Sequence, residues 1–213
     1  RTVAVTGQSE TALQNAGALY LKSYTYSLSN AGYYPGGEPM CIKLLYEPRN
    51  GRLLGAQITG RRGVDKRIDQ FSAAMRHHGT VCDLEELELA YAPPFSSAKD
   101  PVNMAGYVAE NVLTGKSKVF YPEDIPSIPK DAVLLDVRTE DEFRKGHIDG
   151  AVNLALGTLR GGLGRLDRSK EIYVYCQVGL RGYIAEQILR QRGFRVKNLS
   201  GGYRLYRAME QDH

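Results

Sequence analysis

Tyr173-Val174-Tyr175-Cys176-Gln177-Val178-Gly179-Leu180-Arg181-Gly182 is the stretch that decides the fold of the second half of the chain. The β-prone residues before Cys176 predict a buried strand. A helical pattern follows Arg181, with apolar residues at Ile184, Ala185, Ile188 and Leu189. A thiol between a strand and a helix N-terminus lies among backbone N–H groups, which stabilise an anion. We therefore predict a nucleophilic thiolate at Cys176, although a lone cysteine is more often a buried packing residue.

Short strands and helices alternate on both sides of this stretch. Residues 132–137, 171–175 and 195–199 are apolar runs that predict strands, and Thr139 with Glu142 forms a capping box that predicts a helix start. This alternation predicts an α/β domain with a parallel sheet over residues 117–213. Prolines concentrated before residue 130 mark a semi-rigid connection, and we place the domain boundary near residue 117.

Four motifs in this half, in the same order, resemble those of single-domain rhodaneses. They are Leu134-Leu135-Asp136-Val137-Arg138, Phe143-Arg144-Lys145-Gly146-His147-Ile148-Asp149-Gly150-Ala151, the loop Cys176–Arg181, and Leu199-Ser200-Gly201-Gly202-Tyr203. The resemblance covers nearly all of residues 120–210 and implies a rhodanese-like fold. It also implies that the cysteine of the loop carries sulfur as a persulfide.

The resemblance assigns roles to the loop residues. The Cys176 thiolate is expected to attack the outer sulfur of a persulfide, thiosulfate or polysulfide. Backbone N–H groups of the cradling residues Gln177, Val178, Gly179 and Leu180 are expected to stabilise the anion, and Arg181 to close the loop and add positive charge. A phosphatase of the related fold has one more residue between Cys and Arg, so the shorter loop favours sulfur over phosphate. Asp136 and Arg138 are expected to pair with each other, and His147 to make a local hydrogen bond.

The first half, residues 1–116, has the pattern of an α+β module. Strands are predicted at residues 2–6, 24–28, 41–46 and 52–59, and a helix capped by Ser9 is predicted to run through Leu19. Residues 91–101 contain three prolines and predict a long, stiff loop, after which Pro101 begins a helix.

This half resembles the C-terminal dimerisation domain of FAD-dependent pyridine nucleotide-disulfide oxidoreductases, in the branch of coenzyme A-disulfide reductases and NADH-dependent persulfide reductases. The resemblance rests on Gly55-Ala56-Gln57-Ile58, Lys66-Arg67-Ile68-Asp69 and the long string of residues 89–106. It implies a homodimer through residues 1–116. It also implies that Tyr91 and Tyr33, with Tyr34 as the alternative to Tyr33, approach the substrate thiol in the partner subunit. Packing at an interface is the alternative role of these tyrosines.

Cofactor binding is expected to lie outside this chain. No Gly-x-Gly-x-x-Gly turn opens a βαβ unit, so the chain alone is expected to bind neither FAD nor NADH. The resemblance implies FAD, NADH and coenzyme A for a full-length parent. Because Arg1 opens a strand without an initiator Met, we expect the chain to be part of a longer protein.

Composition narrows the setting. The 213 residues carry a net charge of +4 with no long basic block, which argues against a nucleic-acid partner. No apolar run reaches the ~20 residues of a membrane span. The three cysteines are far apart and form no Cys-x-x-Cys pair, which predicts a reducing cytoplasmic setting without a zinc site.

The prediction from sequence is thus sulfane-sulfur transfer through Cys176, within the C-terminal part of a flavin-dependent coenzyme A-disulfide or persulfide reductase. The alternative is a dimerisation and sulfur-binding module without independent turnover.

Overall fold

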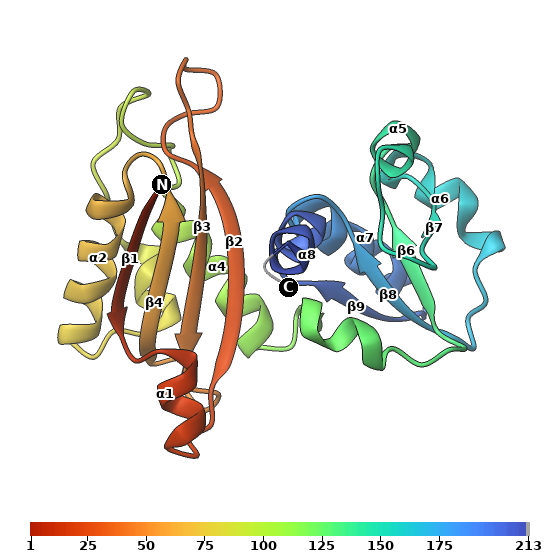
Figure 1. Cartoon of the computed structure of the whole chain (residues 1–213), viewed down its shortest axis with the longest axis horizontal. Coiled ribbons are helices and arrows are strands. Elements are labelled where there is room, and N and C mark those ends of the chain that lie inside the picture. The colour runs from red at the N-terminus through yellow and green to blue at the C-terminus, as the bar shows by residue number, and fades with distance from the viewer. Residues whose placement is uncertain (212–213) are drawn as a thin grey trace. The chain divides into compact units, whose positions relative to one another are not determined.

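The computed structural model describes residues 1–211 as two compact units, one from Arg1 to Lys116 and one from Ser117 onward. Figure 1 shows an antiparallel sheet with helices in the first unit and a second, parallel sheet in the other. No helix of the described part is long and apolar enough to cross a bilayer.

The first unit is a four-stranded antiparallel sheet with its longer helices on one face. Its strand order is β1 (Thr2–Gly7), β4 (Leu53–Gly60), β3 (Pro39–Tyr46) and β2 (Leu21–Leu28). The helices are α1 (Glu10–Asn15), α2 (Val64–Arg76), α3 (Val81–Glu86) and α4 (Pro101–Leu113). Helix α2 packs on β1 and β4 while α4 packs on β2, and alternate strand residues such as Ile42, Leu44 and Ile58 are fully buried beneath them.

The helix predicted after Ser9 is shorter than expected. The Ser9 hydroxyl accepts a hydrogen bond from the Ala12 N–H, as an N-cap does. The helix then ends at Asn15, with Gly17 at φ +63°, and Leu19 is exposed. Glycine reaches this left-handed conformation without strain, so the chain turns there and Leu19 contributes nothing to the core.

The second unit is built on a parallel sheet, as predicted, and this sheet has five strands. Its order is β5 (Val119–Phe120), β9 (Arg195–Leu199), β8 (Glu171–Tyr175), β6 (Val133–Asp136) and β7 (Val152–Asn153). The α-helices are α5 (Glu140–Arg144), α6 (Leu159–Gly162), α7 (Leu180–Gln191) and α8 (Gly202–Glu210), and short 3-10 turns are η1 (Pro122–Ser127), η2 (Leu156–Thr158) and η3 (Leu163–Arg165). Strand β5 was not predicted, because two residues carry no periodic signal.

Strand β8 is covered on both faces. Ile172 and Val174 belong to one apolar cluster, which includes residues of α6 and α7, while Tyr173 and Tyr175 belong to another, with Phe120. Its neighbours β6 and β9 pair with it in parallel register. The residue after a central parallel strand lies at the carboxyl end of the sheet, where loops meet. Cys176 follows β8 and therefore lies at this end.

Candidate functional site

The loop between β8 and α7 places Cys176 at the carboxyl end of the sheet. Cys176 is buried, and its Sγ accepts a hydrogen bond from the Gly179 N–H at 3.2 Å. Gly179 has φ +105°, a conformation that L side chains rarely adopt. Its carbonyl accepts a hydrogen bond from the Asn198 side chain on β9, at 3.2 Å. The loop therefore folds back on the sulfur and is held from the neighbouring strand.

The beginning of α8 fixes the outer side of the same loop. Backbone N–H groups of Tyr203 and Arg204 donate to the carbonyls of Cys176 and Gln177, at 2.8 and 3.0 Å. In a trans peptide the N–H points opposite to the carbonyl. The N–H groups of Gln177 and Val178 are thus turned away from α8. A Cβ on Gly202 would lie only 2.6 Å from the Cys176 carbonyl oxygen, so the close approach requires glycine.

Arg181, which was expected to close the loop and add positive charge, is paired with a carboxylate. Its two terminal nitrogens donate to the two carboxylate oxygens of Glu142, both at 2.7 Å. The hydrogen bonds from Arg181 hold the pKa of Glu142 at about 2. Glu142 lies on α5, 39 positions before Arg181 in the sequence. The capping box with Thr139 was the only pattern in the sequence that singled out Glu142, and it did not indicate the contact with Arg181. The guanidinium lies close to the loop, but its charge is balanced.

Asp136 and Arg138 form a second, buried ion pair beside the loop. The Arg138 Nη2 donates to Asp136 at 2.7 Å, and its Nη1 donates to the Gln177 side chain at 3.2 Å. The guanidinium also lies 4.1 Å from the centre of the Tyr203 ring. This pair therefore holds the Gln177 side chain. His147, in turn, contacts the Phe143 carbonyl at 3.0 Å through Nδ1.

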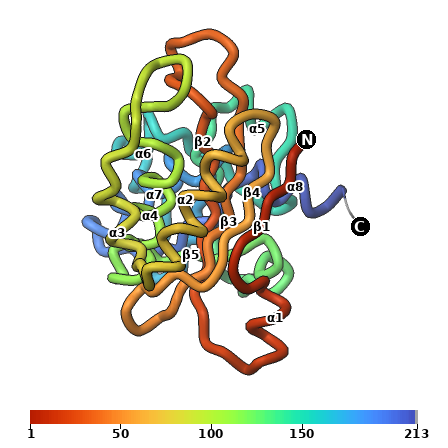
Figure 2. The backbone as a smooth tube through the Cα atoms, turned by 90° about the vertical axis from the view of Figure 1, so that its left-hand side faces the viewer, coloured from red at the N-terminus to blue at the C-terminus, as the bar shows by residue number. Residues whose placement is uncertain are grey.

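The first unit brings two tyrosines of the predicted site together. Figure 2 shows the loops of residues 29–38 and 88–100 at the same end of this unit. The hydroxyls of Tyr33 and Tyr91 lie 2.6 Å apart, and this hydrogen bond raises the pKa of the Tyr91 phenol. Both rings are exposed, as is Tyr34, but the described contacts join Tyr33 to Tyr91.

Arg67 on α2 anchors the two loops that carry Tyr33 and Tyr91. This fully buried arginine pairs with Asp100 at 2.9 Å and donates to the carbonyls of Ser29 and Phe95. Burial alone would raise the pKa of Asp100, but hydrogen bonds from Arg67 and Ser96 lower it overall. The sequence motif around Arg67 had indicated the family without indicating this role.

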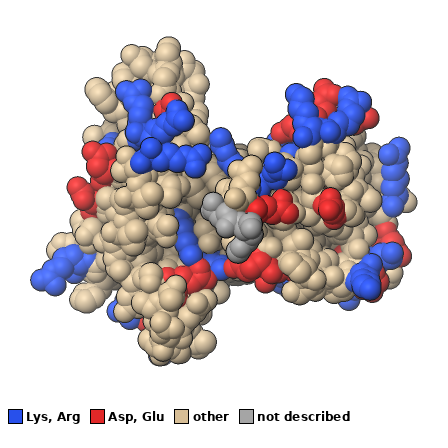
Figure 3. All heavy atoms as spheres, viewed as in Figure 1, with Lys and Arg blue, Asp and Glu red and all other residues tan. Residues whose placement is uncertain are grey.

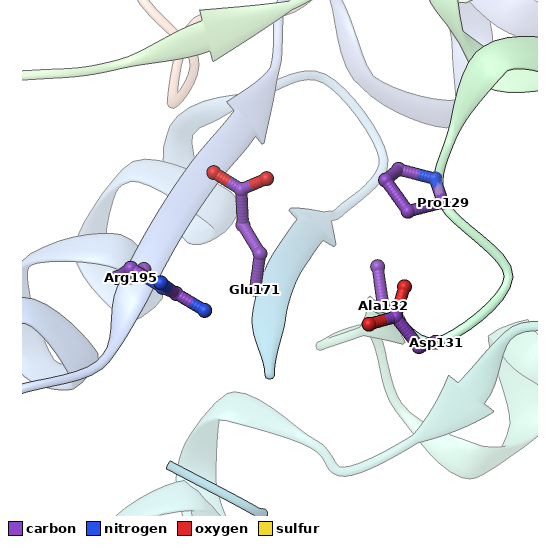
Figure 4. A pocket seen from close by; sticks show the side chains of 5 residues that line it. All are labelled: Pro129, Asp131, Ala132, Glu171 and Arg195. Carbon is purple, nitrogen blue, oxygen red and sulfur yellow. The ribbon is translucent and has the colours of Figure 1, made fainter. Parts of the chain in front are cut away.

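A cavity of about 250 Å³ lies elsewhere in the second unit. It is lined by Pro129, Asp131, Ala132, Glu171 and Arg195, which Figure 4 shows around the beginnings of strands. Glu171 and Arg195 are the first residues of β8 and β9, so this cavity lies at the amino edge of the sheet, opposite Cys176. It is therefore no part of the Cys176 site.

Two patterns typical of dinucleotide and metal sites are absent from the described residues. In residues 1–211 no strand leads through a Gly-x-Gly-x-x-Gly turn into a helix. The turn from β8 to α7, which resembles such a strand–loop–helix unit, begins with a cysteine instead. Within the same residues, no three His, Cys, Asp or Glu side chains gather as metal ligands would.

Comparisons with known families agree with this architecture. Residues 1–101 match the pyridine nucleotide-disulphide oxidoreductase dimerisation domain, and residues 126–209 match the rhodanese-like domain. The chain therefore consists of an oxidoreductase dimerisation domain followed by a rhodanese-like domain, which confirms both resemblances seen in the sequence.

Two solved structures resemble nearly the whole chain, and a curated relative resembles part of it. The structure of reduced CoADR-RHD from Bacillus anthracis has a TM-score of 0.96 and 42% identity, over 99% of this chain and 38% of that one. The NAD-dependent persulfide reductase from A. fulgidus has a TM-score of 0.83 and 36% identity, over 94% of this chain and 36% of that one. The coenzyme A disulfide reductase of Staphylococcus epidermidis is 43% identical over 96 residues, which are 42% of this chain and 22% of the relative. The chain thus spans well under half of each relative.

Proposed function

We propose that the chain transfers sulfane sulfur through a persulfide on Cys176, as the C-terminal part of a flavin-dependent coenzyme A-disulfide or persulfide reductase. The observation that carries the proposal is the hydrogen bond from the Gly179 N–H to the Cys176 sulfur. Carbonyls of the loop are bonded to α8, which leaves N–H groups of Gln177 and Val178 turned to the other side. Such preorganised donors stabilise negative charge on sulfur.

The proposed reaction has two steps. The Cys176 thiolate attacks the outer sulfur of a persulfide R–S–SH, the S–S bond breaks, and R–S⁻ leaves with the bonding electron pair. Cys176 then carries S–SH, and an acceptor thiolate attacks that outer sulfur and releases the Cys176 thiolate. No net oxidation or reduction takes place in either step.

The reducing chemistry belongs, in this proposal, to other parts of a full-length enzyme. FAD and NADH would supply reduction there, because the described residues do not fit a dinucleotide. Coenzyme A or its persulfide is the proposed thiol partner, in keeping with the names of the similar proteins.

The first unit would make the homodimer and present Tyr91 and Tyr33 to the thiol site of the partner subunit. The two hydroxyls share one hydrogen bond, so the hydroxyl that accepts it keeps its own proton and can donate that proton's hydrogen bond to a thiolate. Arg67 supports this role because it fixes both tyrosine loops from one buried position.

Replacement of the cysteine tests the sulfur-transfer proposal. The wild-type chain incubated with a persulfide or thiosulfate is expected to gain one sulfur atom in intact-mass analysis, and to form thiocyanate when cyanide is added. The Cys176→Ser variant is expected to lose both signals, because serine forms no persulfide. Cys82→Ser is the matched control, since this cysteine is exposed and lies in the other unit.

Two outcomes would contradict turnover. The proposal is contradicted if the wild-type chain never gains sulfur. It is also contradicted if the Cys176→Ser variant still forms thiocyanate. A chain that gains sulfur yet passes none to cyanide or to thiols is the alternative module, which binds sulfur without independent turnover.

A further inference from the structure

The guanidinium groups beside Cys176 are both neutralised by carboxylates. Arg138 is paired with Asp136, and Arg181 is paired through two hydrogen bonds with Glu142. The side chains of the Arg181–Glu142 pair are one-third exposed, so solvent and small anions reach this pair, whereas Arg138 and Asp136 are buried. Of the two arginines, Arg181 is therefore the one that can interact electrostatically with an incoming anion.

Glu142 is held in place independently of Arg181. The Thr139 N–H and hydroxyl donate to its Oε2, at 3.0 and 3.1 Å, as a capping box requires. Its pKa of about 2 keeps the side chain charged above pH ~4. Figure 3 shows charged atoms of both signs gathered where α5 lies in Figure 1. Glu142 is thus a fixed negative charge against the arginine of the loop.

The rest of the loop carries no charge, and large apolar side chains are exposed at its end. No charged residue lies between Cys176 and Arg181. Leu180 is 61% exposed, and Ile184, one turn further along α7, is 40% exposed. A donor that approaches the loop therefore meets an apolar rim and a balanced ion pair, while the anion is stabilised by backbone N–H groups. The backbone N–H groups suit one negative charge on sulfur better than two charges on a large anion.

We propose that Glu142 determines charge selectivity at the Cys176 site. By neutralising Arg181 it favours sulfane-sulfur donors with one negative charge, such as thiosulfonates and alkyl persulfides, over the dianion thiosulfate. This inference rests on the proposed sulfur transfer and names the donor class that the site selects.

The two donors follow the same balanced reaction. The Cys176 thiolate attacks the outer sulfur of thiosulfate, the S–S bond breaks, and sulfite leaves with the electron pair. With methanethiosulfonate the same bond breaks and methanesulfinate leaves. Cyanide then removes the outer sulfur as thiocyanate and restores the thiolate. Because acceptor and enzyme intermediate are shared, the two assays differ in the charge and size of the group that leaves.

The test compares the ratio of kcat/KM for thiosulfate to that for methanethiosulfonate in three proteins. Glu142→Gln removes the charge, while glutamine still completes a capping box. Glu140→Gln is the matched control, since it removes the same charge from the same helix at a side chain that pairs with Arg144. We expect the ratio to rise about tenfold in Glu142→Gln, mainly through a lower KM for thiosulfate, because the Arg181 charge is then uncompensated. Glu140→Gln is expected to keep the wild-type ratio.

A ratio in Glu142→Gln within twofold of wild type overturns the inference, as does an equal rise in Glu140→Gln. Alkylation of Cys176, followed by mass spectrometry of its peptide, gives a second readout that needs no sulfur transfer. The rate with iodoacetate relative to neutral iodoacetamide is expected to rise several-fold in Glu142→Gln. If the wild type transfers no sulfur but this alkylation ratio rises, the proposed function fails and charge selection by Glu142 stands. If the alkylation ratio is unchanged, the inference fails by itself.

Discussion

At the scale of single residues, the Cys176 loop requires glycine at two positions, and only the three-dimensional structure shows why. Gly179 has φ +105° and directs its N–H to the sulfur, while Gly202 has φ +62° and lies against the loop backbone. Both glycines lie within sequence motifs of the second unit. The motif that contains Gly202 does not indicate that this residue touches the cysteine.

Gly202→Ala is expected to slow sulfur loading of Cys176 at least about tenfold. The new Cβ would meet the Cys176 carbonyl at 2.6 Å, so the loop must move and its N–H donors with it. The rate is measured by intact mass after mixing with methanethiosulfonate.

Gly150→Ala is the matched control for this substitution. Gly150 also has a positive φ, +78°, but a Cβ there meets open space. Both variants carry a strain of about 1 kcal/mol. Equal loading rates in the two variants would mean that backbone strain, and not displacement of the loop, accounts for any effect.

At the scale of elements, one buried arginine joins α2 to both aromatic loops of the first unit. Arg67 contacts Asp100 at the N-cap of α4 and carbonyls from the loops that carry Tyr33 and Tyr91. A buried charge that loses its partner is costly, because the remaining ion is neither solvated nor paired.

Arg67→Met is expected to lower the free energy of unfolding of the first unit by about 3–5 kcal/mol. Methionine fills much of the volume but leaves the buried Asp100 carboxylate without its close cation, since the remaining one, Lys66, lies 3.8 Å away. Urea unfolding gives the energy, and hydrogen exchange by mass spectrometry is expected to rise in residues 29–37 and 92–99. Arg61→Met, at an exposed position of the preceding turn, is expected to stay within about 0.5 kcal/mol of wild type. An unchanged exchange rate in both loops would contradict the anchoring role.

At the scale of the whole molecule, the first unit exposes large aromatic rings at one end. Phe95 is 69% exposed and lies on the same loop as Tyr91. Exposed apolar clusters of this kind mark interaction surfaces. The match of residues 1–101 to a dimerisation domain indicates which interaction to expect.

Light scattering on the chain is expected to give a mass about twice its 23.6 kDa, because residues 1–116 carry the proposed interface. The measurement is made over a concentration series, since a dimer that forms by mass action dissociates on dilution. A mass that stays at one chain across the series would mean that these residues do not suffice for the dimer.

The sequence by itself determined both fold classes, the two families and the cysteine of the loop. These features depend on local patterns, namely strand and helix periodicity, capping residues and the spacing from Cys to Arg. Such patterns can be recognised from neighbouring residues in the sequence. The short β5 and the early end of α1 escaped prediction, because two residues hold no period and a helix of six depends on its surroundings.

Only the tertiary structure decided how the charges around the site are paired. Arg181 was predicted to add positive charge to the loop, and its partner Glu142 lies 39 positions earlier in the sequence. Asn198 and Gly202 likewise reach the loop from β9 and the start of α8. These contacts arise because parallel strands bring the carboxyl ends of distant segments to one edge of the sheet. No local pattern in a single sequence encodes which side chains meet there.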